Sequence, residues 1–410
     1  FNAQGKLAEA VASYDQAIQL KPDYAEAYYN RGVTLQALGQ LAEAVASYDQ
    51  TIHLKPDYAD AYYNRGITLQ ELGRLAEAMA SYDQTIQLKP DYVAAYYNRA
   101  TTFQALGQLA EVVACYDQVI QLKPDYAEAH NGRATALKEL GQLTEAVVSY
   151  DQAIQLKPDY AEAYSNRGIT LQELGKLAEA VASYDRAIEL KPDYVEAHNN
   201  LGLAFFQMDQ VDAAVSCYER ALSIQPDYII AHVNLGLALE QTDQLDAAFS
   251  CYERALAIEL DCHEARFNLS LLQLGNELLS EGFKNYEVRW QWTEFPSARR
   301  QFSIPRWTGE PLAGKNILIW GEQGIGDEVQ FASLIPEFKD LGCNVRIECT
   351  AKLVEIFQWS FPWAEVRKAG AVNCEGSEVY GLFDYQIPFG SIAPLFRKTL
   401  DDFRIHQKPY

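Results

Sequence analysis

A glycine-rich segment in the last quarter of the chain has the residue types of an anion-binding loop. Residues 321–327 read Gly-Glu-Gln-Gly-Ile-Gly-Asp, between an apolar run at 317–320 and an amphipathic stretch at 327–341. Small residues allow backbone N–H groups to approach an anion at the start of a helix. The spacing matches neither the dinucleotide motif G-x-G-x-x-G nor a P-loop, so it does not by itself predict nucleotide binding. Asp327 opens the predicted helix, where it is either a cap or a general base at the mouth of a sheet.

A second candidate site is a row of asparagines that recurs every 34 residues. The slot is occupied by Asn30, Asn64, Asn98, Asn166, Asn200, Asn234 and Asn268, and once by Gly132. A carboxamide offers one acceptor oxygen and two donor hydrogens, so it can bind a peptide's C=O and N–H whatever the peptide's side chains are. We therefore expect a ladder of amides along a groove. The alternative is that each asparagine satisfies a local or neighbouring-repeat hydrogen bond, or reflects duplication of one unit.

The asparagines belong to a repeat that must position them. Within a unit, apolar-periodic stretches at residues 25–38 and 41–54 are separated by Gly39 and closed by Pro56. Glycine favours a helix end and proline cannot continue a helix, so each unit predicts two antiparallel helices. Small residues at the Gly32 position and large ones at the Tyr48 position are expected where the helices approach closely. On the first helix, the asparagine stripe lies opposite the stripe of Tyr28, which is expected to face the neighbouring hairpin.

Two further slots of the repeat carry polar side chains with expected structural roles. Each asparagine of the early units is followed by an arginine, which we expect to pair with carboxylates of adjacent repeats: Arg31, Arg65, Arg99, Arg133 and Arg167. Cys115, Cys217 and Cys251 occupy the slot that holds serine in other units, and are expected to be small packing residues rather than redox centres.

Composition excludes several classes of partner. The 410 residues are 49% hydrophobic, and the formal net charge of −22 repels phosphate backbones, so nucleic acid is not an expected partner. Residues 1–295 hold 21 basic against 42 acidic residues, which either keeps the repeats soluble or favours basic peptides. Seven cysteines without a C-x-x-C pair predict neither a disulfide framework nor a metal site. No apolar run reaches the ~20 residues that span a bilayer, so the expected location is cytoplasmic.

The repeated positions together resemble the tetratricopeptide repeat (TPR) over about residues 1–292. A lone second helix is followed by eight units, the last degenerate, beginning near Ala25, Ala59, Val93, Ala127, Ala161, Val195, Ile229 and His263. The resemblance implies a mostly α fold, a right-handed superhelix whose concave groove binds a partner polypeptide. The repeats are also similar to those of O-linked N-acetylglucosamine transferase, whose asparagine ladder holds substrate peptides. By that resemblance the seven asparagines are peptide contacts. Self-association through other exposed faces stays open.

The C-terminal part has a different organisation. Residues 293–315 read as an irregular linker, and from 316 to 410 glycine loops, strands and helices alternate. Expected strands lie at residues 317–320, 345–349, near 366 and at 385–387. This alternation predicts a parallel sheet with helices on both faces and a ligand site at the carboxyl ends of the strands.

Residues 300–410 resemble the N-terminal, Rossmann-like half of the heptosyltransferase-like glycosyltransferases of the GT-B fold, in bacterial proteins that fuse it to tetratricopeptide repeats. The resemblance implies that Asp327 is the candidate catalytic base and that Gly324 and Gly326 form the acceptor or anion loop. Glu322 and Gln323 would flank the cleft. A nucleotide sugar would be the donor substrate, with no cofactor in this stretch.

The donor-binding half of the GT-B fold would follow Tyr410, so we expect this stretch alone to be inactive. Because the chain begins in mid-repeat, we also expect a longer natural protein. The leading hypothesis is a solenoid that presents a polypeptide to a glycosyltransferase-type domain. The alternative is a non-enzymatic scaffold or assembly factor in which the α/β part only caps the repeats.

Overall fold

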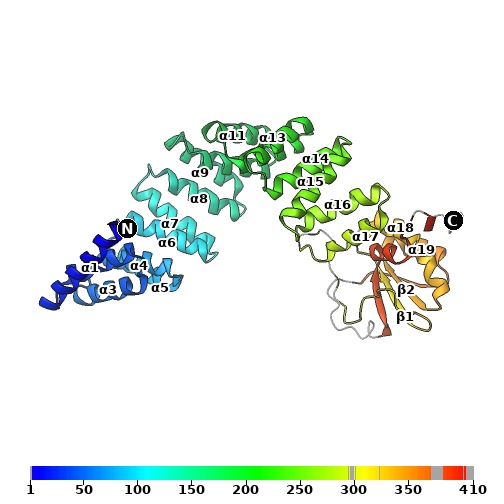
Figure 1. Ribbon diagram of the computed structural model, residues 1–410, viewed down its shortest axis with the longest axis horizontal. Helices are drawn as coiled ribbons and strands as arrows, with labels where there is room; N and C mark the ends of the chain where they lie inside the picture. The colour runs from blue at the N-terminus through cyan, green and yellow to red at the C-terminus, as the bar shows by residue number, and fades with distance from the viewer. Residues whose placement is uncertain are drawn as a thin grey trace. The chain divides into compact units, whose positions relative to one another are not determined.

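The computed structural model describes residues 2–293, 295, 300, 302–322, 324–370, 382–399 and 401–402, with side chains from Lys6 on. It divides into two compact units, Phe1–Ala213 and Ala214–Tyr410. Both contain helical repeats, and the second also contains a parallel sheet (Figure 1).

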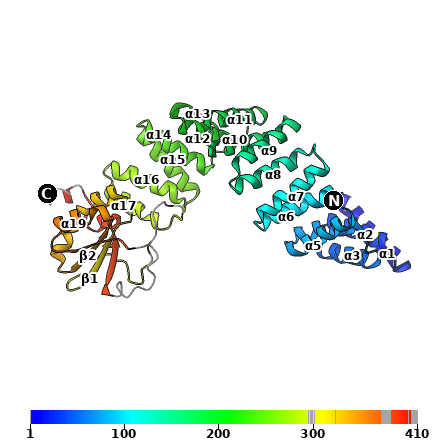
Figure 2. The ribbon, with the colours of Figure 1, turned by 180° about the vertical axis from the view of Figure 1, so that it is seen from behind.

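The first unit is a row of antiparallel helix pairs, which can be followed from both sides in Figures 1 and 2. Its helices are α1 (Asn2–Leu20), α2 (Ala25–Ala37), α3 (Leu41–Leu54), α4 (Ala59–Glu71), α5 (Leu75–Leu88), α6 (Val93–Ala105), α7 (Leu109–Leu122), α8 (Ala127–Glu139), α9 (Leu143–Leu156), α10 (Ala161–Glu173), α11 (Leu177–Leu190) and α12 (Val195–Gln207). Helix α2 ends as the sequence predicts: Gly39 has φ of 75°, and the N–H groups of Gly39 and Gln40 return to the carbonyls of Gln36 and Leu35 at 2.9 Å.

The second unit continues the helical pattern and then changes to α/β. Its helices are α13 (Val211–Ile224, which begins at the boundary), α14 (Ile229–Gln241), α15 (Leu245–Ile258), α16 (His263–Gly275), α17 (Leu279–Tyr286), η1 (Glu287–Trp290), α18 (Ile325–Ala332), η2 (Ile335–Leu341), η3 (Ala351–Leu353), α19 (Val354–Ser360), η5 (Phe389–Ser391) and α20 (Ala393–Phe396). Its strands are β1 (Asn316–Trp320), β2 (Asn344–Cys349), β3 (Glu365–Lys368) and β4 (Tyr385–Pro388).

In four of the helix pairs a tyrosine ring of the second helix packs directly on a glycine of the first helix. A Cβ built on Gly32 would lie 2.7 Å from Cε1 of Tyr48, and the same close approach recurs at Gly66, Gly168 and Gly236. Tyr48 is fully buried. No real Cβ fits at such distances, so the ring of the second helix occupies space that only glycine leaves open on the first helix. The predicted pairing of small and large positions is therefore confirmed.

The third unit of the row uses a different arrangement, which explains the missing asparagine. Ala100 stands at the glycine position, and its methyl group occupies the space that the ring would need. A Cβ built on Gly132, in the following unit, would lie 2.5 Å from Cζ and 2.7 Å from Oη of Tyr116. The ring of Tyr116 thus packs on the next unit instead, and Gly132 replaces asparagine because any side chain there would collide with it.

The arginines of the early units join consecutive hairpins, as predicted. Arg31 donates through Nε to Oδ1 of Asp15 and through Nη1 to Oγ of Ser47, both at 2.7 Å. The same two contacts recur around Arg65, Arg133 and Arg167. Arg99 is the exception: its Nε lies 3.3 Å from Asp83, but its serine partner is replaced by Cys115 and this nitrogen is buried without a hydrogen bond.

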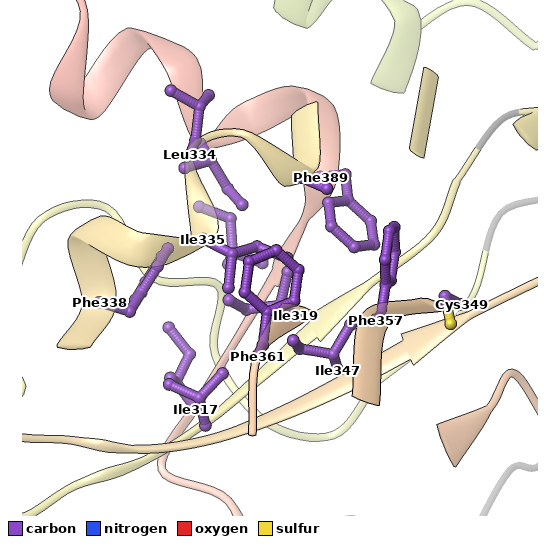
Figure 3. Packing of buried hydrophobic residues seen from close by; sticks show 14 of the residues in the cluster. Ile317, Ile319, Leu334, Ile335, Phe338, Ile347, Cys349, Phe357, Phe361 and Phe389 are labelled. Carbon is purple, nitrogen blue, oxygen red and sulfur yellow. The ribbon is translucent and has the colours of Figure 1, made fainter. Parts of the chain in front are cut away.

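The sheet of the second unit has four parallel strands in the order β3-β2-β1-β4. Figure 3 shows its main core, in which Ile317, Ile319 and Ile347 meet Phe338 and Phe357 from the connections that follow β1 and β2. Leu279 and Phe283 of α17, and Trp307 and Leu312 from the segment before β1, belong to the same core. The last repeat helix therefore packs directly with the α/β part. The predicted domain boundaries at residues 292 and 316 stay a prediction.

The described helices that connect β1 to β2 and β2 to β3 cover one face of the sheet, whereas the sequence led us to expect helices on both faces. Buried apolar residues of α18, η2, η3 and α19 join the core on the Ile317 and Ile347 face, while Leu318 and Trp320 of the other face pack with Phe302, Ile304 and Trp290, the last residue of η1. The reason is topological. The crossovers from β1 to β2 and from β2 to β3 advance in the same direction, and right-handed crossovers then lie on the same face.

Replacing Cys115 by serine should stabilise the first unit, because the new hydroxyl can accept a hydrogen bond from Nη1 of Arg99. Ser81 accepts such a bond from Arg65 at 2.9 Å. We expect the free energy of unfolding, measured by urea titration followed by circular dichroism, to rise by about 0.5–1.5 kcal/mol. Cys251→Ser is the matched control, since Leu235 stands at the arginine position of that unit. An equal rise in both variants would contradict this assignment.

Replacing Gly132 by asparagine should destabilise the first unit rather than complete the amide ladder. The collision with Tyr116 is expected to lower the free energy of unfolding by about 1–3 kcal/mol. Adding Ala100→Gly should recover part of this loss, because the ring can then return to its own hairpin. A double-mutant cycle from urea titrations measures the coupling, expected to exceed about 0.5 kcal/mol. Purely additive effects would show that the two sites do not share the tyrosine.

Candidate functional site

The asparagine stripe borders a hollow of about 300 Å³ between α10 and α12. Its wall is formed by Ile169, Gln172, Glu173, Tyr184, Asn200, Leu203 and Gln207. On α12, Asn200, Leu203 and Gln207 follow the helical spacing of one face, which is why their side chains meet there. The hollow combines an aliphatic floor with several hydrogen-bonding groups, and is the best-defined candidate site of the repeats.

Hydrogen bonds fix the polar groups of this hollow. Tyr184 donates to Oε1 of Gln172 at 2.9 Å, and Nε2 of Gln172 donates to Oε1 of Gln207, also at 2.9 Å. Asn199 donates to Oδ1 of Asn200 at 3.3 Å. Burial, and then the charge of Glu173, raise the pKa of Tyr184, so its hydroxyl stays a donor. Both donor hydrogens on Nδ2 of Asn200 are left for another acceptor.

The predicted peptide contacts are not equivalent in the structure. Asn30 is exposed and the others are half-buried: Asn64, Asn98, Asn166, Asn200, Asn234 and Asn268. Asn64 donates to the hydroxyl of Tyr29 at 2.8 Å, and Asn98 donates to that of Tyr63 at 3.0 Å. Each of these two amides therefore uses one donor hydrogen for a bond to the preceding unit. For Asn64 and Asn98 this is the alternative role named in the sequence analysis, a hydrogen bond to a neighbouring repeat. Asn234 and Asn268 lie in the second unit.

Sequence reasoning missed the aromatic residues beside the first asparagines. Tyr29 stacks on Tyr58 with ring centroids 4.9 Å apart, and the pattern repeats for Tyr63 with Tyr92 at 4.8 Å and Tyr97 with Tyr126 at 5.4 Å. The signal was present, since the early units read Tyr-Tyr-Asn and only the first tyrosine of each pair was considered. Glu173 and Gln207 were also missed, although each lies seven residues after a predicted asparagine.

The glycine loop leads from β1 into α18, at the carboxyl edge of the sheet. Helix α18 starts at Ile325, two residues earlier than expected, and Gly324 donates its N–H to Oδ2 of Asp327 at 3.2 Å. Asp327 therefore acts as a cap through one oxygen while its side chain stays half-exposed. A Cβ on Gly326 would meet nothing within 4 Å, and one on Gly324 only Asp327, so the loop leaves space in front of the helix. Gln323 lies outside the described residues.

Glu322 is buried in an ion pair and does not line an open cleft. Its Oε1 accepts hydrogen bonds from Nη2 of Arg289 at 3.0 Å and from the N–H of Gly390 at 2.8 Å, and its side chain is 4% exposed. Arg289, fully buried, also donates to Ser391 at 2.7 Å and to Glu287 at 3.0 Å. Burial alone would raise the pKa of Glu287, but Arg289 and Arg306 lower it overall. This cluster joins the end of the repeats to β1 and β4.

A larger hollow, about 440 Å³, lies at the opposite edge of the sheet from the one predicted. Its lining comes from the amino ends of the strands and includes Asn316, Asn344, Arg346, Glu365 and Phe383. Arg346 is neutralised by Glu365 at 2.7 Å and lies over the ring of Phe383. Of the residues proposed for the acceptor loop, the described ones (Glu322, Gly324 and Gly326) do not border this hollow, and size alone does not make it a site.

The described residues contain neither a metal-binding cluster nor a membrane-spanning helix. Among them, no three or more His, Cys, Asp or Glu side chains are grouped so that they could hold a metal ion. Within the same part of the chain, no helix is both long enough and apolar enough to cross a membrane.

Comparison with known proteins gives partial matches. Protein FlbA of Caulobacter vibrioides is 32% identical over 136 residues, which are 30% of this chain and 23% of that protein. The chain thus spans about a quarter of the length of the curated relative that it matches. Among solved structures it is similar to YrrB, described as a TPR protein with an unusual peptide-binding site (23% identity, 45% of this chain, 95% of that chain, TM-score 0.41). It is also similar to MamA, with 26% identity over 41% of this chain and 92% of that chain and a TM-score of 0.38. A tetratricopeptide repeat protein from Parabacteroides merdae is similar as well, with 17% identity over 61% of this chain and 98% of that chain and a TM-score of 0.48.

Family models match most of the helical part. The model described as TPR repeat matches residues 1–39, 35–73, 68–107, 101–141, 134–175 and 171–209, and the one described as tetratricopeptide repeat matches residues 193–259. Together with the paired helices of both units, these matches show that the chain belongs to the tetratricopeptide repeat family, whose members bind polypeptides.

Proposed function

We propose that the solenoid binds an extended polypeptide along its asparagine stripe and that the α/β part acts on that polypeptide as part of a sugar transferase. The observation that carries the binding step is the hollow between α10 and α12, which Asn200 borders; within the described residues, Nδ2 of Asn200 donates no hydrogen bond. An extended peptide exposes a carbonyl and an N–H at every residue, and carboxamides complement both. Because the amides recur with every unit, they can contact one chain at several points without requiring a particular peptide sequence.

The α/β part supports an acceptor site at the glycine loop. In a sheet ordered β3-β2-β1-β4, the chain leaves β1 toward β2 on one side, while β4 lies on the other. Such a switch point is where open parallel sheets bind ligands, just beyond the carboxyl ends of the strands. The loop follows β1 directly, and Gly324 and Gly326 leave open space at the start of α18.

In the proposed reaction, a side-chain hydroxyl of the polypeptide attacks the anomeric carbon of a nucleotide sugar. The new C–O bond forms as the bond to the nucleotide phosphate breaks, and Asp327 takes the hydroxyl proton. The carboxylate of Asp327 is half-exposed beside the glycine loop, and it accepts the cap bond from Gly324 through Oδ2. The sugar nucleotide would be a substrate, held mainly by a second GT-B half.

A non-enzymatic scaffold is the second candidate, and specific contacts favour it. Two carboxylates at the loop have structural partners, Asp327 in the cap of α18 and Glu322 in the ion pair with Arg289. A sheet that uses its acidic groups in this way can serve simply to close the end of the repeats. Polypeptide binding is common to both candidates.

Replacing Asn166, Asn200 and Asn234 together with alanine should weaken polypeptide binding about tenfold or more, because several backbone hydrogen bonds are lost. Helicity and melting temperature should stay nearly unchanged. Binding can be measured with peptides selected from a displayed library, using fluorescence polarisation. The comparison variant Asn64→Ala/Asn98→Ala should instead lower the melting temperature, because Tyr29 and Tyr63 lose their partners. Unfolding of the triple variant would assign those asparagines a structural role.

The natural full-length protein, incubated with mixed radiolabelled nucleotide sugars and cell lysate, should label proteins, and its Asp327→Asn form should not. Asparagine can still accept the cap hydrogen bond from Gly324, so the fold should be retained. Asp340→Asn, an exposed carboxylate on η2, is the matched control and should label normally. Equal labelling by the Asp327→Asn protein would show that Asp327 takes no part in the reaction. If no form labels any protein, the sugar-transferase proposal is wrong and the non-enzymatic scaffold is favoured.

A further inference from the structure

We propose that the hollow between α10 and α12 takes a lysine or arginine side chain of the bound polypeptide, with Glu173 as its counter-charge. This inference rests on the proposed binding of a polypeptide and names the side chain that the repeats select. The backbone contacts of the asparagine stripe would be general, and this position would give preference to basic segments.

The size and floor of the hollow suit one long side chain. Its volume of about 300 Å³ lies at the lower end of the range for small-molecule sites, about 300–1,000 Å³. Ile169 and Leu203 supply aliphatic walls from the two helices, and the ring of Tyr184 closes the space between them. The methylene stem of lysine or arginine can pack along such walls while its charged end stays near the rim.

A carboxylate stands at this rim without a partner. Glu173 is exposed, and within the described residues its carboxylate has no ion pair or hydrogen bond. Other acidic side chains of the repeats do have partners: Glu128 is paired with Lys157 at 3.0 Å, and Glu179 with Lys176 at 3.8 Å. The negative charge of Glu173 is therefore available to a cation from outside, and it would repel an acidic side chain.

The remaining polar groups also restrict what can enter. Gln172 uses its oxygen for Tyr184 and donates to Gln207, so it is held in place. The amides that keep free donors, on Asn200 and Gln207, suit peptide carbonyls rather than a cation. An entirely apolar side chain would fit the walls but would leave the carboxylate unpaired. A basic side chain matches both the walls and the carboxylate.

The neighbouring helix pair shows why the preference is specific to this place. In α8 the residue corresponding to Gln172 is Lys138, so the chain itself supplies a cation beside Glu139. Between α4 and α6, Nε2 of Gln70 lies within 3.4 Å of Thr101, and its oxygen accepts from Tyr82 and Thr102. The overall charge of residues 1–295, with 21 basic against 42 acidic residues, attracts basic segments toward the whole solenoid.

The test is a selection from a random dodecapeptide library displayed on phage, carried out on the full chain. Parallel selections use Glu173→Gln and the matched control Glu145→Gln, an exposed carboxylate on the second helix of the fourth unit. Peptides enriched on the unchanged chain and on Glu145→Gln should share a lysine or arginine at one position. In a synthetic peptide, replacing that residue by methionine should weaken binding about threefold to tenfold to the unchanged chain, and less than twofold to Glu173→Gln.

The outcomes separate the two proposals. Enriched peptides without a shared basic residue, or the same loss of affinity on Glu173→Gln as on the unchanged chain, would overturn this inference and leave polypeptide binding intact. Recovery of no peptide by the unchanged chain would overturn both.

Discussion

The packing of a tyrosine ring directly on a glycine is the constraint on which the repeats depend. At 2.5 to 2.7 Å from a built Cβ, the rings of Tyr48, Tyr82, Tyr184 and Tyr252 leave room for a hydrogen atom and nothing larger. This contact sets how closely the two helices of a hairpin approach. Because it recurs at the same position of the 34-residue repeat in four helix pairs, it also fixes the spacing of the residues on the opposite stripe of the first helix. The regular row of asparagines is a consequence of that spacing.

Much of the repeat architecture could be predicted because each position is sampled in several units. Helices expected at residues 25–38 and 41–54 are found at Ala25–Ala37 and Leu41–Leu54, and the arginines pair with carboxylates as expected. What could not be predicted depends on single departures from the repeat. The ring of Tyr116 packs on Gly132 of the next unit, which leaves no room there for an asparagine side chain. Such an effect can be recognised only from side-chain positions, which the 34-residue periodicity of the sequence does not give.

The α/β part was predictable to the level of its strands. All four expected strands are present and parallel, because apolar runs and loop signals are local. The role of Glu322 could not be predicted from the sequence, because its partner Arg289 lies 33 residues earlier and belongs to the end of the helical repeats. A carboxylate next to a glycine loop looks the same in the sequence whether it faces a ligand or a buried guanidinium. Only the position of Arg289 distinguishes the two.

The structure also changes how the amide ladder should be understood. Asn64 and Asn98 are partly used by the tyrosines of the preceding units, and Gly132 interrupts the row. A polypeptide lying along this face would therefore find an aromatic stretch near Tyr29 and Tyr63 and a more polar stretch near Asn200. A uniform ladder would bind any extended chain in many registers. A row that changes character along its length favours one register, and a basic side chain in the Glu173 hollow would select it.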